Sequence, residues 1–294
     1  MDSAAPPSSQ ADGGVPHGHN DVAQIQTKNN MGFDMGIPSY RADTWWSSYD
    51  PQHPELPLVD IGSGLGTNVL AALRHGARVI AVDMSDDHLA EIRAKATALD
   101  SNAPGVTAGE TAEKRLETRW GRLPDQVPLS PRSVSGILCA QVLHFLNPDG
   151  VRASFQRFSE CLAPGGVLVV LACGHYQKLC SLIPGKIAAI DAATLRDPAG
   201  SHGCVTREEM KPMTEAIRAV LPEELHPAVL KDTTEFQTFS PQHLETVAQA
   251  VGLEVEVAEF CDGRLSNYPV FLYEEKEEDR GREQVLLIAR KPGP

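Results

Sequence analysis

The feature that most limits the fold of this chain is an apolar run that ends in a glycine-dense turn. Residues 58–61 read Leu-Val-Asp-Ile, and Gly62, Gly64 and Gly66 alternate directly behind them. A short apolar run bounded by glycine is typical of a buried parallel strand, and glycine lets the backbone turn sharply and approach a ligand closely. Residues 69–73 then repeat apolar side chains at helical spacing, which predicts a helix after the turn.

A second strand that ends in an acid completes a β-α-β unit. Gly76 predicts the end of the helix, and residues 78–82 form a β-branched, apolar run that leads into Asp83. Asp83 follows Gly62 by about twenty residues, the spacing at which an acid meets ribose hydroxyls in nucleotide-binding folds. We therefore expect an adenosine-containing cofactor at the carboxyl ends of these two strands.

The spacing of the glycines separates two classes of enzyme. A dinucleotide fingerprint, G-x-G-x-x-G, needs a glycine where this chain has Thr67, which disfavours a nicotinamide oxidoreductase. The pattern is instead D-x-G-x-G-x-G, led by Asp60. It resembles motif I of the class I S-adenosylmethionine (SAM) methyltransferases, in which Asp83 would be the acidic partner on the second strand.

Two later segments extend this resemblance. Residues 162–168, Leu-Ala-Pro-Gly-Gly-Val-Leu, look like the family's L-x-P-G-G turn before its fifth strand. Residues 142–146, Val-Leu-His-Phe-Leu, look like the segment after the fourth strand in small-molecule members, including quinone-biosynthesis types. The resemblance covers residues 57–174 and 238–292.

Strand and helix patterns alternate along the chain, which predicts an α/β, doubly wound parallel sheet. A weak strand is expected near Val106, and clearer ones at 134–139, 167–172, 253–257 and 284–290. The resemblance implies a seven-stranded, mostly parallel Rossmann-like sheet whose last strand is antiparallel, plus a helical lid insertion. The expected parts are a disordered tail (1–20), an N-terminal helical cover (21–56), a SAM-binding core (57–174 and 238–294) and a helical lid or substrate insertion (175–237).

The resemblance also implies the cofactor site. The backbone at Gly62–Gly64 would cradle the methionine part of SAM, Asp83 would take the ribose hydroxyls, and Met84 and Glu110 would meet the adenine. Arg41 would either pair with the methionine carboxylate as a two-pronged donor or only pack. The complete set of expected cofactor residues is Arg41, Asp60, Gly62, Ser63, Gly64, Gly66, Asp83, Met84, Glu110, Thr111, Cys139, Ala140 and Gln141.

Three side chains are candidates for catalysis. Methyl transfer from a sulfonium is an in-line displacement, so the enzyme mainly aligns the acceptor and excludes water, and some acceptors also need a base. His144 follows the fourth strand, and His175 and Tyr176 follow the fifth; for each, packing or hydrogen bonding is the alternative. The remaining histidines are expected at the surface, at helix caps or in the lid: His53, His75, His88, His202, His226 and His243.

Composition limits the partners. A net charge of −13 disfavours nucleic acid and anionic membranes, and no apolar run is long enough to span a membrane. The six cysteines form no C-x-x-C pair and no ligand-like cluster with histidine, so we expect reduced thiols, a cytoplasmic location and no metal. The acidic run at 274–279 is expected to form a solvated hairpin tip.

The leading hypothesis is a methyltransferase that uses SAM, acts on a small-molecule acceptor at O, N or C, and releases S-adenosylhomocysteine (SAH). The alternatives are a methyltransferase with a protein acceptor and a non-enzymatic protein that binds SAM or a nucleoside. The insertion at 175–237 would sit over the carboxyl edge of the sheet and shape an acceptor pocket. Alternatively, it would serve for dimerisation and the chain would form a homodimer.

Overall fold

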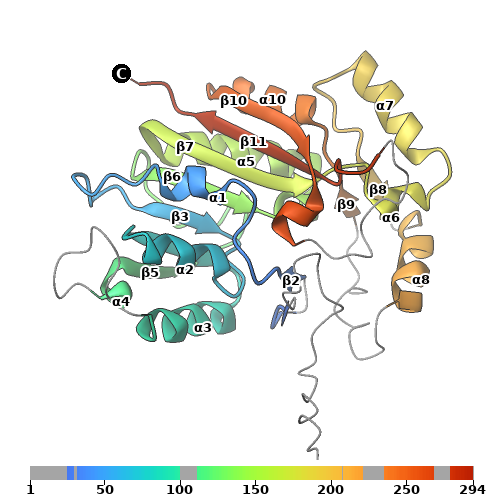
Figure 1. Cartoon of the computed structure of the whole chain (residues 1–294). Coiled ribbons are helices and arrows are strands. Elements are labelled where there is room, and N and C mark those ends of the chain that lie inside the picture. The colour runs from blue at the N-terminus through green and yellow to red at the C-terminus, as the bar shows by residue number, and fades with distance from the viewer. Residues whose placement is uncertain are drawn as a thin grey trace, which may run out of the picture.

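A seven-stranded sheet with helices on both faces forms the centre of the molecule (Figure 1). The computed structural model describes residues 25–29, 32–99, 111–206, 208–220, 235–267 and 279–293. The strand order is β10-β11-β7-β6-β3-β4-β5, and β11 alone runs opposite to the other six strands. This confirms the predicted fold. The strands are β3 (Leu58–Ile61), β4 (Val79–Asp83), β5 (Leu116–Trp120), β6 (Val134–Ala140), β7 (Leu162–Cys173), β10 (Glu254–Cys261) and β11 (Gln284–Arg290).

Each face of the sheet has its own core, because alternate residues of a strand point to opposite sides. Val59 and Ile61 of β3 belong to one buried cluster, and Leu58 belongs to the other. The first cluster includes residues of α5 (Pro148–Cys161) and α10 (Pro241–Ala250). The second includes residues of α1 (Ala42–Trp46), α2 (Thr67–Arg74) and α3 (Asp86–Thr97). Both faces of these strands are therefore buried, as their largely apolar sequences predict.

The segment before the sheet is less helical than expected. It consists of a hairpin, β1 (Ile25–Gln26) and β2 (Phe33–Asp34), and the five-residue helix α1. Its chain crosses the start of α2, where the Ser39 backbone N–H donates to Asn68 Oδ1 at 2.8 Å. The same segment is tied to the short helix η3 (Gly263–Ser266), since the Tyr40 N–H donates to Ser266 Oγ at 3.0 Å.

The third strand does not lie where the sequence predicted it. Val106 and Glu110 fall outside the described residues, and the strand that pairs with β4 is β5, which starts at Leu116. Thr111 precedes α4 (Ala112–Arg115), which leads directly into β5. Because Leu116 pairs with Val79 at the start of β4, Thr111 lies toward the amino edge of the sheet. The error followed from weak periodicity in this segment, which left the strand without a clear pattern.

The insertion between β7 and α10 contains strands as well as helices. Its helices are α6 (Lys178–Ser181), α7 (Lys186–Arg196) and α8 (Met210–Val220), and β8 (Cys204–Thr206) pairs antiparallel with β9 (Glu235–Gln237). The chain enters and leaves at one place, because the Phe239 N–H donates to Cys173 O at the end of β7. These elements lie beyond the carboxyl ends of the parallel strands (Figure 1). Within the described ranges, no helix is long and apolar enough to cross a membrane.

Candidate functional site

The turn after β3 has three glycines with positive φ, at +75° for Gly62, +53° for Gly64 and +89° for Gly66. A Cβ atom on Gly62 would lie 2.3 Å from Val142 Cγ2, and one on Gly66 would lie 2.7 Å from Ile92 Cγ1. A Cβ atom on Gly64 would meet nothing within 4 Å. Two of the glycines are therefore required by packing, whereas Gly64 borders open space.

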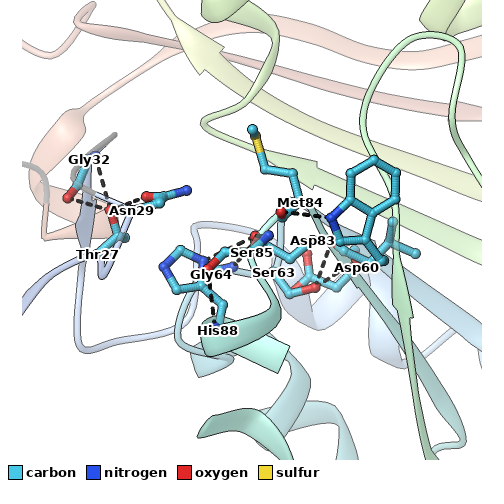
Figure 2. A network of polar contacts seen from close by, with 12 residues as sticks. Thr27, Asn29, Gly32, Asp60, Ser63, Gly64, Asp83, Met84, Ser85 and His88 are labelled. Atoms are coloured by element: carbon cyan, nitrogen blue, oxygen red, sulfur yellow. Dashed lines mark hydrogen bonds and ion pairs between the residues drawn. The ribbon is translucent and has the colours of Figure 1, made fainter. Parts of the chain in front are cut away.

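Ser63 and Asp83 hold this turn in place. Ser63 Oγ is buried and donates to the carbonyls of Asp60 and Val82, so its side chain faces the protein. Asp83 Oδ2 accepts a hydrogen bond from the Gly64 N–H at 2.9 Å. The structure thus brings together the acid at the end of β4 and the glycine loop after β3 (Figure 2).

Asp60 lies in β3 beneath the glycine loop and is 1% exposed. Its Oδ2 has no hydrogen-bond partner among the described residues. Burial and the nearby carboxylates of Asp83 and Asp34 raise the pKa of Asp60 to about 8. Asp34 reaches the site from β2 and accepts a hydrogen bond from Thr67 Oγ1 at 2.6 Å. Three acids so close together suit a ligand that carries positive charge, because such a charge would relieve their repulsion.

Two large apolar side chains are exposed at the carboxyl ends of β4 and β5. Met84 is 39% exposed and Trp120 is 46% exposed, and Trp120 Nε1 donates to Met84 O at 2.9 Å. Met84 was expected at this place. The sequence analysis missed Trp120 because it placed the third strand about ten residues too early. The sequence signal that could have located Trp120 is the short strand-like run at 116–120.

Thr111 does not lie at this edge, and the Arg41 side chain contacts its own helix. Thr111 lies before α4, where Arg115 Nη1 donates to the carbonyls of Leu73 and Ala77 at the far end of α2. Thr111 was expected among the cofactor residues, but it lies toward the amino edge of the sheet, because β5 starts after it. Arg41 is exposed and its Nε lies 3.4 Å from Thr44 Oγ1 of the same helix.

The end of β6 carries the next group of expected residues. Cys139 is fully buried with the cluster that covers the opposite face from Asp60, so only its backbone can lie along a cofactor. Burial raises the pKa of the Cys139 thiol. Ala140 packs against the cluster on the other face of the sheet, which includes Leu58, and Gln141 follows with a φ of +60°. This strained conformation at a non-glycine residue marks the point where β6 leaves the sheet.

His144 lies in the 3₁₀ turn η1 (Leu143–Phe145), next to the end of β7. Its Nδ1 is 3.3 Å from Cys173 Sγ, and Cys173 Sγ is 3.7 Å from Gln141 Oε1. Phe236 of the insertion packs on the His144 ring, with 5.0 Å between centroids. Burial lowers the pKa of His144 to about 3, so the ring is neutral near pH 7.

His175 and Tyr176 contact the insertion instead. His175 Nε2 lies 2.9 Å from Asp191 Oδ1 of α7, and Tyr176 Oη donates to the same oxygen at 2.9 Å. His175 Nδ1 donates to Phe239 O at 3.2 Å. Burial raises the pKa of Tyr176 to about 12, and the Arg282 guanidinium lies 3.5 Å from the Tyr176 ring centroid. These contacts hold α7 against the end of β7 and occupy both nitrogens of His175.

Two histidines that were expected at the surface, at caps or in the lid are buried. His88 is 1% exposed and His243 is 3% exposed. Burial lowers the pKa of His243 to about 4. His88 Nδ1 lies 3.1 Å from Asp83 Oδ1, which places it in the candidate site (Figure 2). Both follow a serine cap by three residues, and cap spacing alone does not reveal which way the third side chain turns.

The described ranges contain no group of three histidine, cysteine or acidic residues that could hold a metal ion. All six cysteines lie in the described residues, and none of them forms a disulfide. The polar groups at the carboxyl edge are thus the acids, the glycine-loop amides, Gln141 and the buried histidines. Together with the exposed Met84 and Trp120, they suit a cationic nucleoside ligand better than a metal centre.

Comparisons with known proteins agree with this arrangement. Residues 58–166 match the family model described as a methyltransferase domain. A SAM-dependent methyltransferase from Methanosarcina mazei superposes with a TM-score of 0.56 at 13% identity, covering 88% of this chain and all of that one. The geranyl diphosphate C-methyltransferase from Streptomyces coelicolor gives 0.50 at 13% identity, covering 85% of this chain and 76% of that one. No curated protein matches the sequence.

The fold is the Rossmann-like fold of the SAM-dependent methyltransferases. Residues 58–166, which hold the glycine loop and Asp83, carry the match to the methyltransferase-domain model and support an enzyme of this kind. The resemblance to quinone-biosynthesis members stays a prediction.

Proposed function

We propose that this methyltransferase acts on a small-molecule acceptor that binds between the glycine loop and the insertion at 175–237. The observation that carries the proposal is the position of His144. It is buried at the carboxyl ends of β6 and β7, and Phe236 of the insertion covers it. A covered, aromatic-lined position suits a small acceptor better than a protein segment, which would need an open groove. In this proposal the insertion is a lid.

The cofactor residues follow from the same geometry. Gly62 and Gly64 would receive the methionine part of SAM, and Asp83 would receive the ribose. Asp60 and Asp34 would face the positive charge of the cofactor. The carboxylate of Asp60 is buried, its Oδ2 has no partner among the described residues, and the half-buried Asp34 adds negative charge beside it. The exposed side chains of Met84 and Trp120 would flank the adenine.

SAM supplies an activated methyl group when it is bound, so the chain mainly has to align the acceptor. The acceptor atom would bond to the methyl carbon as the carbon–sulfur bond breaks, which leaves SAH. His144 is neutral but weakly basic, since burial lowers its pKa to about 3. We therefore assign it the role of orienting the acceptor through a hydrogen bond, and of taking a proton only from an acidic acceptor.

Among proteins of the same fold, the Streptomyces coelicolor enzyme acts on geranyl diphosphate, a small molecule. This supports the class of acceptor and not its identity. A small acceptor bound next to His144 and Phe236 would contact an aromatic surface at one end and Gln141 at another. The proposal covers O-, N- and C-acceptors, because the in-line displacement needs the same alignment for each.

Isothermal titration calorimetry with SAH tests the cofactor assignment. The wild-type protein should bind SAH, and Asp83→Ala should raise the dissociation constant by roughly 10–100-fold, since a hydrogen bond to a charged group contributes about 1.5–3 kcal/mol. Asp87→Ala is the matched control, because Asp87 is an exposed acid in the next helix. Tight binding of NAD with none of SAH would contradict the proposal.

A further inference from the structure

Three polar side chains from separate elements meet at the carboxyl ends of β6 and β7. Gln141 directly follows β6, His144 lies in η1, and Cys173 is the last residue of β7. Cys173 Sγ lies 3.3 Å from His144 Nδ1 and 3.7 Å from Gln141 Oε1. Cys173 is fully buried, whereas His144 keeps an exposed fraction of 5%. The thiol therefore stands between the histidine and the glutamine and contacts both.

The ring of His144 is held between neighbours that restrict its rotation. Phe145 packs against it with 4.2 Å between the ring centroids, and Phe236 of the insertion packs with 5.0 Å. A half-turn of the ring would take Nδ1 away from the thiol. Because the ring position is set in this way, its hydrogen bonding depends on which of the two nitrogens carries the proton.

The single proton of the thiol distinguishes the two possibilities. A thiol donates one hydrogen bond, and its sulfur is a weak acceptor. When the S–H of Cys173 donates to Gln141 Oε1, the sulfur can accept from His144 Nδ1, and both neighbours of the thiol are paired. When the S–H points at Nδ1 instead, Gln141 Oε1 loses this donor, and Gln141 Nε2 has no partner within the described ranges either. The first arrangement pairs more of the polar groups at this buried position, as most proteins do.

We propose that Cys173 is a positioning residue that holds His144 with its proton on Nδ1 and a lone pair on Nε2. The two nitrogens of an imidazole point to different sides of the ring, so Nε2 points away from the thiol. In the part of the chain that the structure describes, the enclosed side-chain atoms without a partner do not include His144 Nε2. The exposed part of the ring therefore includes this nitrogen.

A lone pair on Nε2 selects acceptors by the polarity of their hydrogen bonds. It accepts a hydrogen bond from an O–H or N–H group and repels the lone pairs of a carbonyl or ether oxygen. The inference rests on the proposed function, since it assumes that the acceptor binds next to His144. It narrows the acceptor to a small molecule that presents a hydroxyl or N–H group at this point, on the methylated atom or close to it.

Nitrogen-15 spectra of the ligand-free, histidine-labelled protein test the assignment, because protonated and unprotonated imidazole nitrogens resonate in separate regions. The signals that vanish in His144→Gln identify this ring. In the wild type, Nδ1 should have the protonated signature and Nε2 the unprotonated one. The reverse pattern, or an average of the two, would overturn the role of Cys173. This measurement does not depend on whether any variant folds.

Three variants separate a hydrogen-bonded relay from simple packing. Cys173→Ser should keep the wild-type pattern, because a hydroxyl also donates and accepts. Gln141→Leu removes the acceptor of the thiol proton and should move the His144 proton to Nε2, and an unchanged pattern there would contradict the relay. Cys261→Ala, a buried cysteine at the end of β10, is the matched control and should leave the pattern as in the wild type. Failure of the wild type to bind SAH would instead overturn the proposed function, whatever the spectra show.

Discussion

Single residues at the carboxyl edge show how a ligand site differs from the surrounding core. Asp60 is buried in the sheet near the carboxylates of Asp83 and Asp34, and its Oδ2 finds no partner among the described residues. A buried acid of this kind lowers the stability of the empty protein, and a bound cation would offset that cost. Removal of the Asp60 carboxylate is therefore expected to raise the stability of the ligand-free protein and to weaken the binding of a cationic ligand.

The pH dependence of stability follows from the raised pKa of Asp60, about 8 in the folded protein. The unfolded chain titrates near 4, so the folded state binds the proton more tightly, and stability is lost as pH rises from about 4 to about 8. Asp60→Asn should therefore raise the melting temperature of cofactor-free protein at pH 8.5 by a few degrees, and change it less at pH 5. Calorimetric scans at the two pH values check this, and an equal effect at both would contradict it.

Gly62 and Gly64 make a matched pair for separating packing from binding. Both have positive φ, so alanine strains the backbone at either, at a cost of about 1 kcal/mol. Gly62→Ala also places a methyl 2.3 Å from Val142 Cγ2 and should lower the melting temperature markedly. Gly64→Ala meets no protein atom and should mainly weaken SAH binding. Melting curves and SAH titrations of the two variants should thus diverge; a similar loss of stability in both would argue against open space at Gly64.

At the scale of elements, the sequence predicted most strands of the sheet. It predicted the edge strand β5 and the elements of the insertion only in part. Strands β3, β4, β6 and β7 are largely apolar, which local sequence identifies because most of their residues are buried on both faces. Strand β5 lies at the sheet edge with half-exposed residues, so its pattern is weak and it was predicted about ten residues too early. The β8–β9 pair was not predicted, since its three-residue strands are held by partners some thirty residues apart.

The attachment of α7 to the sheet gives a prediction at this scale. Asp191 is the common partner of His175 and Tyr176, so it links the helix to the end of β7. Asp191→Ala should speed amide hydrogen exchange in residues 186–196, because the helix keeps few other polar ties to the sheet, and should leave exchange in β3 and β4 unchanged. Asp197→Ala, at the exposed C-terminal end of the same helix, is the control. Equal protection in both variants would mean that Asp191 does not anchor the helix.

For the whole molecule, the carboxyl edge is assembled from segments that lie far apart in the chain. Asp34 of β2 accepts a hydrogen bond from Thr67 of α2, and Asn267, which follows η3, donates to Met35 O across 232 positions. Phe236 reaches His144 only because the insertion enters and leaves at the end of β7. Such contacts form only in the complete fold. The sequence of one segment therefore does not show which residues of the insertion cover the candidate site.

The sequence by itself determined the glycine loop, the acid at the end of the second strand and the buried strands around them, because each depends on the local pattern of a few neighbouring residues. It placed Asp60, Asp83 and Met84 at one edge of the sheet, since parallel strands end together there. Only the tertiary structure decided that His88 contacts Asp83, that Trp120 lies beside Met84 and that Asp191 ties down His175. The physical reason is that burial and side-chain direction depend on what packs against a residue, and those partners are distant in the chain.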